Sequence, residues 1–413
     1  ADGDVIWYAS VQVEGSHRLR LNLADVSLPP GAHLWVYGSK GDFNGPFGME
    51  LADSTGQIWT PSVSGPEIKL VVMVPEGDEP ARFMLDRVLQ LFELNSFGEP
   101  ILQPQEDPPA DTSCLLQTLC VNPNPFSPIE NVEKSIGAME FVVNGEGSVC
   151  TGGLVADTDP NSTRALFLTA NHCFETQDVA TTLQVFWDFK SETCNGEAPD
   201  KTSMPNSSGS TLLATGKPAD FTLLELNSIP AGRYFLPYNK NESAAAPGVT
   251  LYRVSHPLGK EQHYSQSTVN SGTHACGETW TDTTHIWQSY VQGSTLGGSS
   301  GSPVLTAAGE IVGQLSGTCG EEGVTPDCKT EPTIDGRLSN YFNEVAQFLE
   351  PSSGGTDTGD LAVANVSVPE GSYSSGSTLQ VNTQVNNVGN SASNAYTVTY
   401  YASTDSTITT CLL

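Results

Sequence analysis

The sequence predicts a mostly β protein that is divided into more than one domain. Its 413 residues are more than a single compact domain usually holds. Stretches in which apolar and polar residues alternate recur along the chain, whereas long helical periodicity is nearly absent. The 40 glycines and 27 prolines supply the many turns that a chain of short strands requires.

Residues 1–105 are predicted to form a β-sandwich domain. In the segment RLRLNL, residues 18–23, Leu19, Leu21 and Leu23 alternate with polar residues and share one face. HLWVYG, IKLVVMVP and RFMLDRVLQLF are further strand candidates, separated by glycine and proline turns, so we expect about seven or eight strands. Residues 93–113 contain four prolines and five acids without apolar periodicity, which is typical of a connector.

The block that follows, residues 114–351, contains eight of the nine cysteines and is predicted to be the second domain. Near its end, SNYFNEVAQFLEP predicts a helix capped by Ser339 and stopped by Pro351, with an apolar face of Tyr341, Val345, Phe348 and Leu349. Residues 352–360 form a second linker, rich in glycine, serine and threonine. Residues 361–413 alternate again, as a short and partial β module.

The formal net charge is −30, from 47 acidic against 17 basic residues. This balance excludes nucleic acid and anionic membrane surfaces as partners, since few cations are present to neutralise phosphates. No apolar run approaches the ~18 residues of a membrane helix, so no membrane span is expected. Strong acidity is typical of a protein kept soluble in a salty or extracellular medium.

The cysteines and histidines show no spacing typical of metal sites. No C-x-x-C pair occurs, which argues against a zinc ribbon. Dispersed cysteines in an acidic, β-rich chain instead indicate disulfides and a secreted, extracellular protein. We expect neither a metal nor a cofactor. The histidines outside the motifs described next are interpreted as structural or surface residues: His17, His33, His256, His263, His274 and His285.

Three motifs supply what acyl transfer at a peptide bond requires. GSSGSP, residues 298–303, sets serines between glycines, so that the backbone can turn tightly and direct its amides at an oxyanion. ALFLTANHCF leads from an apolar strand into His172, a candidate base beside Cys173. ADFTLLEL places Asp220 at the mouth of another strand, where a buried acid would orient the base. The rival acid, Asp188 in VFWDFK, lies mid-strand beside Lys190, as an acid on a solvated face does.

The order and spacing of these motifs resemble the chymotrypsin-like serine peptidases, and their residues most resemble the bacterial lysyl endopeptidase branch. There the reactive serine is the third residue of Gly-Ser-Ser-Gly-Ser-Pro, which corresponds to Ser300 rather than to Ser299 or Ser302. The resemblance covers about residues 115–350 and implies a two-barrel β peptidase with its site in the cleft between the barrels. Gly298 and the Ser300 amide would then form the oxyanion hole.

Both flanks also resemble known modules. Residues 7–92 look like the prosegment of lysyl endopeptidase precursors, on the segments LPPGAHLWVYG and IWTPSVSGPEIKLVVMVP. The tail after residue 360 resembles the start of a CARDB-type adhesion module. The first resemblance implies a zymogen whose N-terminal domain packs on the peptidase domain and acts as a folding aid or an inhibitor.

Two disulfides are predicted with defined partners. Cys150 and Cys173 would form a clamp on the loop of His172, and the family resemblance implies that Cys120 pairs with Cys194. The other pairs stay open, because spacing alone does not determine connectivity: Cys114 with Cys319 or Cys328, and Cys276 with the other of these two, which leaves Cys411 unpaired.

The substrate pocket receives the side chain that precedes the cleaved bond, at the P1 position. A basic P1 side chain needs a buried carboxylate at the pocket floor, because an unpaired ammonium is costly to bury. Trypsin-like enzymes place that acid six residues before the nucleophile, where this chain has the neutral Ser294. Lysyl endopeptidases place it three residues before a Gly-Arg pair, where this chain has Thr333.

Asp335 is therefore the candidate acid of the pocket floor, with an ion pair to Arg337 or a turn-stabilising role as its alternatives. The strand GQLSG would form one wall, with Ser316 and Gly317 toward the substrate. Residues 88–133 contain no Lys or Arg, so a Lys/Arg-specific enzyme could not cut itself there. Either another protease matures the chain, or the domains stay joined, or P1 is not basic.

The sequence thus predicts a secreted serine endopeptidase that acts on protein or peptide substrates and prefers Lys or Arg at P1. The alternative is an adhesion or binding protein on an inactive peptidase scaffold, in which the outer β modules carry the function. The intact set of Ser300, His172 and Asp220 favours the enzyme.

Overall fold

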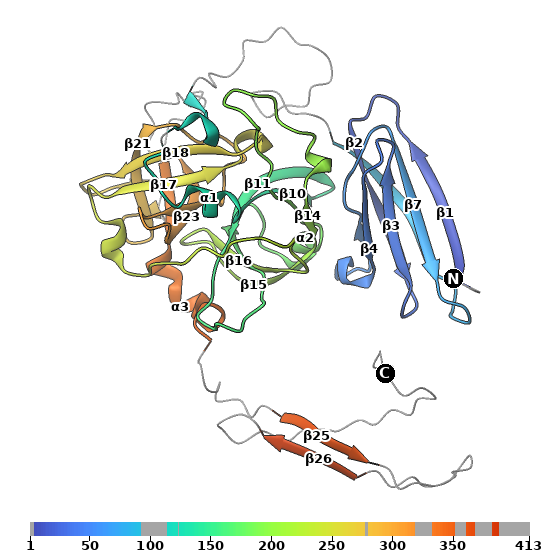
Figure 1. The fold of residues 1–413 in the computed structure, drawn as a ribbon. Coiled ribbons are helices and arrows are strands. Elements are labelled where there is room, and N and C mark those ends of the chain that lie inside the picture. The colour runs from blue at the N-terminus through green and yellow to red at the C-terminus, as the bar shows by residue number, and fades with distance from the viewer. Residues whose placement is uncertain are drawn as a thin grey trace. The chain divides into compact units, whose positions relative to one another are not determined.

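The computed structural model describes residues 4–91, 114–122, 124–276, 280–318 and 333–351, and the backbone of 361–367 and 382–387. Most of its elements are β-strands, which confirms the predicted fold class (Figure 1). The chain divides into two compact units, residues 1–156 with 163–345, and residues 157–162 with 346–413.

The N-terminal strands form two antiparallel sheets, as predicted for a sandwich. One sheet has the order β1 (Val5–Gln12), β7 (Glu67–Val74), β3 (His33–Gly38), β4 (Phe43–Phe47). In the other, β2 (Arg18–Ser27) pairs with β5 (Ile58–Trp59), β6 (Val63–Ser64) and β8 (Arg82–Leu91). A short 3-10 helix, η1 (Met49–Leu51), lies between β4 and β5.

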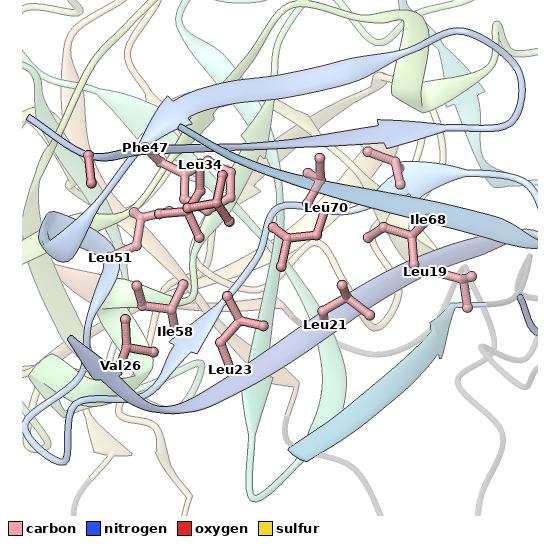
Figure 2. Packing of buried hydrophobic residues seen from close by; sticks show 14 of the residues in the cluster. Leu19, Leu21, Leu23, Val26, Leu34, Phe47, Leu51, Ile58, Ile68 and Leu70 are labelled. Carbon is pink, nitrogen blue, oxygen red and sulfur yellow. The ribbon is translucent and has the colours of Figure 1, made fainter. Parts of the chain in front are cut away.

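Strand β2 is buried on both faces, although its sequence alternates. Its apolar face lies in the sandwich core, which Figure 2 shows with contributions from β3 and β7: Leu19, Leu21, Leu23, Leu34, Ile68 and Leu70. On the opposite face Arg20 is only 2% exposed, and its guanidinium donates to the carbonyls of Thr60 and Thr182, each at 2.7 Å. Thr182 belongs to the following domain, so this second face is an interface rather than a solvated surface.

Residues 136–226 contain a seven-stranded antiparallel sheet that carries the motifs of His172 and Asp220. Its order is β14 (Asn206–Ser208), β13 (Gln184–Phe186), β10 (Ile136–Val143), β11 (Glu146–Leu154), β12 (Leu166–Ala170), β16 (Phe221–Leu226), β15 (Ser210–Gly216). Two short helices, α1 (Ile129–Glu133) and α2 (Gln177–Thr181), and η4 (Lys201–Ser203) lie before and between these strands. This sheet is the first half of the predicted two-barrel fold.

The GSSGSP motif leads into β22 of a second seven-stranded sheet. Its order is β17 (Thr250–Ser255), β22 (Pro303–Leu305), β23 (Ile311–Thr318), β24 (Thr333–Arg337), β21 (His285–Gln292), β18 (His263–Val269), β9 (Leu116–Gln117). Because β17 pairs with β18 as well as with β22, six of these strands close into a barrel. The smaller elements are η3 (Thr118–Cys120), η5 (Glu242–Ala245), η6 (Pro257–Gly259) and the pair β19 (Ala275–Cys276) and β20 (Trp280–Thr281).

The predicted C-terminal helix is α3 (Leu338–Leu349), which follows β24 directly. The expected cap was wrong, because the helix begins at Leu338, so that Ser339 lies inside its first turn. Beyond it, β25 (Leu361–Ser367) and β26 (Asn382–Asn387) form an antiparallel pair. Among the described helices, none is both long enough and apolar enough to cross a bilayer.

Candidate active site

His172 and Asp220 meet because two paired strands end at the same place. Ala170 in β12 pairs with Phe221 in β16, so the residue after one strand lies beside the residue before the other. The His172 backbone amide donates to Asp220 Oδ1 at 2.8 Å, and His172 Nδ1 lies 2.8 Å from Asp220 Oδ2. An ionised carboxylate only accepts, so Nδ1 carries the hydrogen and Nε2 keeps a lone pair. The imidazole side chain is 43% exposed and the carboxylate 6%, so the candidate base is accessible while the acid beside it is shielded.

Asp220 is held in an uncommon backbone conformation by contacts that the sequence analysis missed. Its φ of 53° lies in the left-handed region, which non-glycine residues seldom occupy. Its carbonyl accepts from the Asn171 amide at 3.0 Å and from Gln314 Nε2 at 3.1 Å. The oxygen of the Gln314 side chain in turn accepts from the Tyr341 hydroxyl at 2.5 Å, and the Tyr341 ring stacks on Phe221 with centroids 4.1 Å apart. Helix α3 therefore supports the orienting acid.

The nucleophile loop exposes one of its three serines. Ser299 and Ser302 are 0% exposed, whereas Ser300 is partly exposed. Gly298 and Gly301 have φ values of 90° and 80°, and a Cβ there would approach neighbouring atoms to 2.9 and 2.1 Å. Only glycine fits these two positions without strain or displacement of neighbours. The loop can therefore present Ser300, and neither neighbouring serine, to a substrate.

Some backbone amides of this loop donate to carbonyls of the protein, and others have no acceptor. The N–H groups of Ser299, Gly301 and Ser302 donate to carbonyls of the protein. Within the described residues, those of Gly298 and Ser300 have no acceptor. An oxyanion hole needs such unpaired donors, and here one belongs to the partly exposed serine itself and the other to the glycine two residues before it.

The first sheet ties the base to the nucleophile loop. Cys150 and Cys173 form the expected disulfide, with Cα atoms 6.4 Å apart, next to His172. Both sulfurs lie within 4.8 Å of a ring nitrogen of His172, but they are bonded to each other and are not free to hold a metal. Thr151, which follows Cys150 in β11, donates its backbone amide to the Ser300 carbonyl at 2.8 Å. One strand, β11, thus anchors both groups.

The other cysteines follow the expectation as far as the structure describes them. Cys120 and Cys194 form a disulfide with Cα atoms 4.6 Å apart. Cys114 and Cys276 are each also part of a disulfide. Their expected partners, Cys319 and Cys328, lie outside the described residues. So does Cys411, which was expected to be unpaired.

The rival acid Asp188 is occupied elsewhere. Arg233 binds it through both guanidinium nitrogens, at 3.0 Å to Oδ1 and 2.5 Å to Oδ2. Lys190, its neighbour in sequence, instead pairs with Glu133 at 2.5 Å. A carboxylate in a bidentate pair has its acceptor positions filled. Asp188 is therefore an ion-paired acid, and the expectation that it lies mid-strand was wrong, because β13 ends at Phe186.

Asp335 lies in β24 but is not an open acid at a pocket floor. It is 0% exposed, and its two oxygens accept from the guanidinium of Arg253 and from the side-chain amide of Gln288. Burial raises its pKa, although the charge of Arg253 opposes this. Arg337, the partner considered from sequence, donates to the His285 carbonyl at 3.2 Å. The carboxylate is already balanced inside the protein, which corrects the expectation of an acid kept free for the substrate.

The other expected pocket residues are neutral. Ser294, Ser316 and Thr333 are 3%, 5% and 0% exposed, and Gly317 is partly exposed. Among the described residues, the hydroxyls of Ser316 and Thr333 have no hydrogen-bond partner. The segment that joins β23 to β24, residues 319–332, lies outside the described residues. The described wall therefore offers hydroxyl groups rather than a charge.

The motifs indicate the candidate catalytic residues but not the residues that hold them in place. Thr151, Arg253 and Gln314 are buried polar residues inside strands, with exposed fractions of 0%, 2% and 0%. Polar side chains on buried strands require partners, which is the signal that could have singled them out. Their partners lie far away in sequence, so the motifs gave no indication of them.

Two family models match this chain. Lysyl endopeptidase, C-terminal domain, matches residues 110–329, and Lysyl endopeptidase N-terminal domain matches residues 1–90. A curated relative, lysyl endopeptidase from Pseudomonas aeruginosa, is 27% identical over 317 residues, 72% of this chain and 64% of the relative. The match therefore spans less than two thirds of that relative's length.

Solved protease structures share a more distant similarity. The HtrA-type protease AlgW with tripeptide has 13% identity and a TM-score of 0.39, over 60% of this chain and 69% of that one. The serine endoprotease from Yersinia pestis has 15% identity and a TM-score of 0.38, over 55% and 67%. Similarity at this level adds nothing to the fold derived from the strands above.

Proposed function

Because the chain belongs to the lysyl endopeptidase family, we propose that it is a serine endopeptidase that acts through Ser300, His172 and Asp220. The observation that carries the proposal is the pair of 2.8 Å contacts between His172 and Asp220, together with a partly exposed Ser300 between buried serines. The oriented base and the unpaired amides also argue against an inactive scaffold. The disulfides support secretion into an oxidising compartment.

The proposed reaction has an acylation and a deacylation. Ser300 Oγ attacks the peptide carbonyl carbon while its proton passes to His172 Nε2, and the Gly298 and Ser300 amides bind the resulting oxyanion. The C–N bond then breaks, the amine takes the proton from His172, and an ester remains on Ser300. Water attacks this ester in the same way and releases the acid. Asp220 keeps the imidazole oriented and stabilises its protonated form.

A basic P1 residue is part of the proposal, and the family alone supports it. Asp335 does not supply the counter-charge, because Arg253 already balances it. In the sequence between β23 and β24, outside the described residues, the chain has four acids: Glu321, Glu322, Asp327 and Glu331. Cleavage-site profiling on a peptide library measures the preference directly, and cleavage after acidic or apolar residues would contradict it.

The catalytic assignment is tested by exchanging the serines one at a time. Ser300→Ala is expected to abolish labelling by a fluorophosphonate probe, and its residual rate should be ~10³- to 10⁴-fold above water at most. Ser299→Ala is the matched control, because it removes a neighbouring hydroxyl but leaves the nucleophile, and it should still be labelled. The assignment would be overturned if the probe labelled the Ser300→Ala variant, or if it failed to label the unaltered protein.

A further inference from the structure

The oxyanion hole has a weak point at the peptide between Gly297 and Gly298. Neither residue has a Cβ, and no atom would lie within 4 Å of a Cβ at Gly297. Glycine populates positive and negative φ about equally, so this peptide could turn over and direct its N–H away from the substrate. Some part of the protein has to hold the peptide in one orientation if the Gly298 amide is to stabilise an oxyanion.

The 255–260 loop, with the sequence SHPLGK, provides that contact. The Leu258 amide donates to the Gly297 carbonyl at 2.5 Å. In a planar trans peptide the C=O and N–H point in opposite directions, so fixing the Gly297 carbonyl also fixes the Gly298 N–H. Leu258 adopts φ 57° and ψ 23°, the left-handed conformation that leucine seldom takes. Leu258 thus holds an uncommon backbone conformation at the point where its amide contacts the Gly297–Gly298 peptide.

The same loop also contacts the next two residues of the nucleophile loop. The His256 amide donates to Thr151 Oγ1 at 3.0 Å, and this hydroxyl donates to the Gly298 carbonyl at 2.8 Å. Ser255 Oγ donates to Ser299 Oγ at 3.1 Å. A Cβ on Gly298 would lie 2.9 Å from the Leu258 amide nitrogen, which shows how closely the two loops pack.

The His256 side chain closes the 255–260 loop upon itself. Its Nδ1 lies 2.8 Å from the Lys260 carbonyl, which can only accept, so Nδ1 carries the hydrogen. The ring is fully buried and stacks on Phe189 with centroids 6.0 Å apart, and among the described residues Nε2 has no partner. From outside the loop, Lys201 Nζ donates to the Gly259 carbonyl at 2.7 Å. One imidazole nitrogen therefore bridges the loop while the other makes no hydrogen bond.

We propose that the 255–260 loop aims the oxyanion hole, and that His256 is the positioning residue that keeps the Leu258 amide on the Gly297 carbonyl. The proposal rests on the proposed peptidase function, because the hole matters only if an oxyanion forms. His256 touches no reacting atom in this scheme. It acts through the loop, and its effect should appear in the transition state rather than in substrate binding.

The experiment compares three substitutions of His256 in the full chain, with a peptide substrate. His256→Asn places an amide N–H near the position of Nδ1 and can restore the bond to Lys260, whereas His256→Gln places it near Nε2 and cannot. We expect His256→Ala and His256→Gln to lower kcat about 10- to 100-fold with KM nearly unchanged, part of the effect of losing an oxyanion donor. His256→Asn should stay within about fivefold of the unaltered protein. The Ki of a peptide aldehyde, which forms the oxyanion, should rise in proportion to the fall in kcat.

A core substitution separates this role from general destabilisation. Leu251→Ala, in β17, removes a 0% exposed side chain from the strand that precedes the loop, in a core cluster with Val304 and Val312. It should lower the melting temperature without changing kcat. The proposal fails if His256→Gln is as active as His256→Asn, if His256→Ala keeps its kcat, or if Leu251→Ala loses kcat equally. A failure of the peptidase assignment is distinct, since the unaltered protein would then not react with a fluorophosphonate probe.

Discussion

Ser300 is distinguished from the serines beside it by what their hydroxyls contact. Ser299 Oγ accepts from Ser255 at 3.1 Å, and Ser302 Oγ accepts from Arg253 Nη1 at 3.0 Å. Buried hydroxyls need such partners, and these two have theirs inside the protein. The same Arg253 carries the ion pair to Asp335. At the scale of single residues, a buried charge pair therefore lies beneath the nucleophile loop and supports it.

The pair with Arg253 predicts that Asp335→Asn acts on stability rather than on selectivity. Removing the carboxylate leaves a buried guanidinium uncompensated, which typically costs ~3–5 kcal/mol of unfolding free energy. Urea unfolding should show this loss, while the ratio of cleavage after Lys to cleavage after Leu stays the same. A combined Arg253→Met and Asp335→Leu variant, which removes both charges, should recover part of the stability. A stable Asp335→Asn protein that had lost only cleavage after Lys and Arg would instead restore the pocket-floor role.

Helix α3 shows how an element outside the barrels reaches the site. Its sequence predicts an apolar face, and the structure buries Tyr341 and Val345 at 1% exposure each. Tyr341 carries a hydroxyl on that face, which donates to Gln314, and Gln314 holds the Asp220 carbonyl. An amphipathic pattern accounts for the packing of the helix but not for this hydrogen bond. The helix is therefore both a cover for the core and a support for the orienting acid.

Tyr341→Phe is expected to weaken that support while keeping the ring stack. The substitution leaves the side-chain oxygen of Gln314 buried without its donor, at a cost of about 1–3 kcal/mol in unfolding free energy. We expect kcat to fall several-fold with KM little changed, because Asp220 loses part of its restraint. Val345→Ala, on the same face, is the matched control, since it loosens the helix without touching Gln314. Equal losses of kcat at equal stability in the two variants would refute the supporting role.

At the scale of the whole molecule, the N-terminal domain and the first sheet share a buried charge network. Arg18 binds Glu140 through two contacts of 2.7 Å, and Lys201 binds the same carboxylate at 2.9 Å. Although burial opposes it, these cations hold the pKa of Glu140 well below its ordinary value. Further hydrogen bonds from residues 4–91 reach Thr182, Gln184 and Asp200, which lie on or beside the first sheet.

Glu140→Gln should therefore destabilise the full chain more than Arg18→Met does. The first change leaves two cations uncompensated, so we expect it to lower the unfolding free energy by ~3–5 kcal/mol. The second leaves Glu140 paired with Lys201, so its loss should be smaller. Because the pKa of Glu140 is lowered on folding, its stabilisation is complete above about pH 4.5 and is lost as the pH falls below that value. Urea unfolding at pH 7 and pH 4 should show a smaller pH effect in Glu140→Gln. If Glu140→Gln and Arg18→Met lowered the unfolding free energy equally, the network would not couple the two domains as described.

The sequence by itself determined the strand-rich fold, the three candidate catalytic residues and the clamp between Cys150 and Cys173. These are readable because each depends on local order: alternation along one strand, glycines around one serine, or a cysteine beside one histidine. Only the tertiary structure decided that Arg253 neutralises Asp335, 82 residues away, and that the Leu258 amide holds the Gly297 carbonyl. Buried charges and carbonyls take the partners that strand packing brings near them, and packing joins residues irrespective of their distance along the chain.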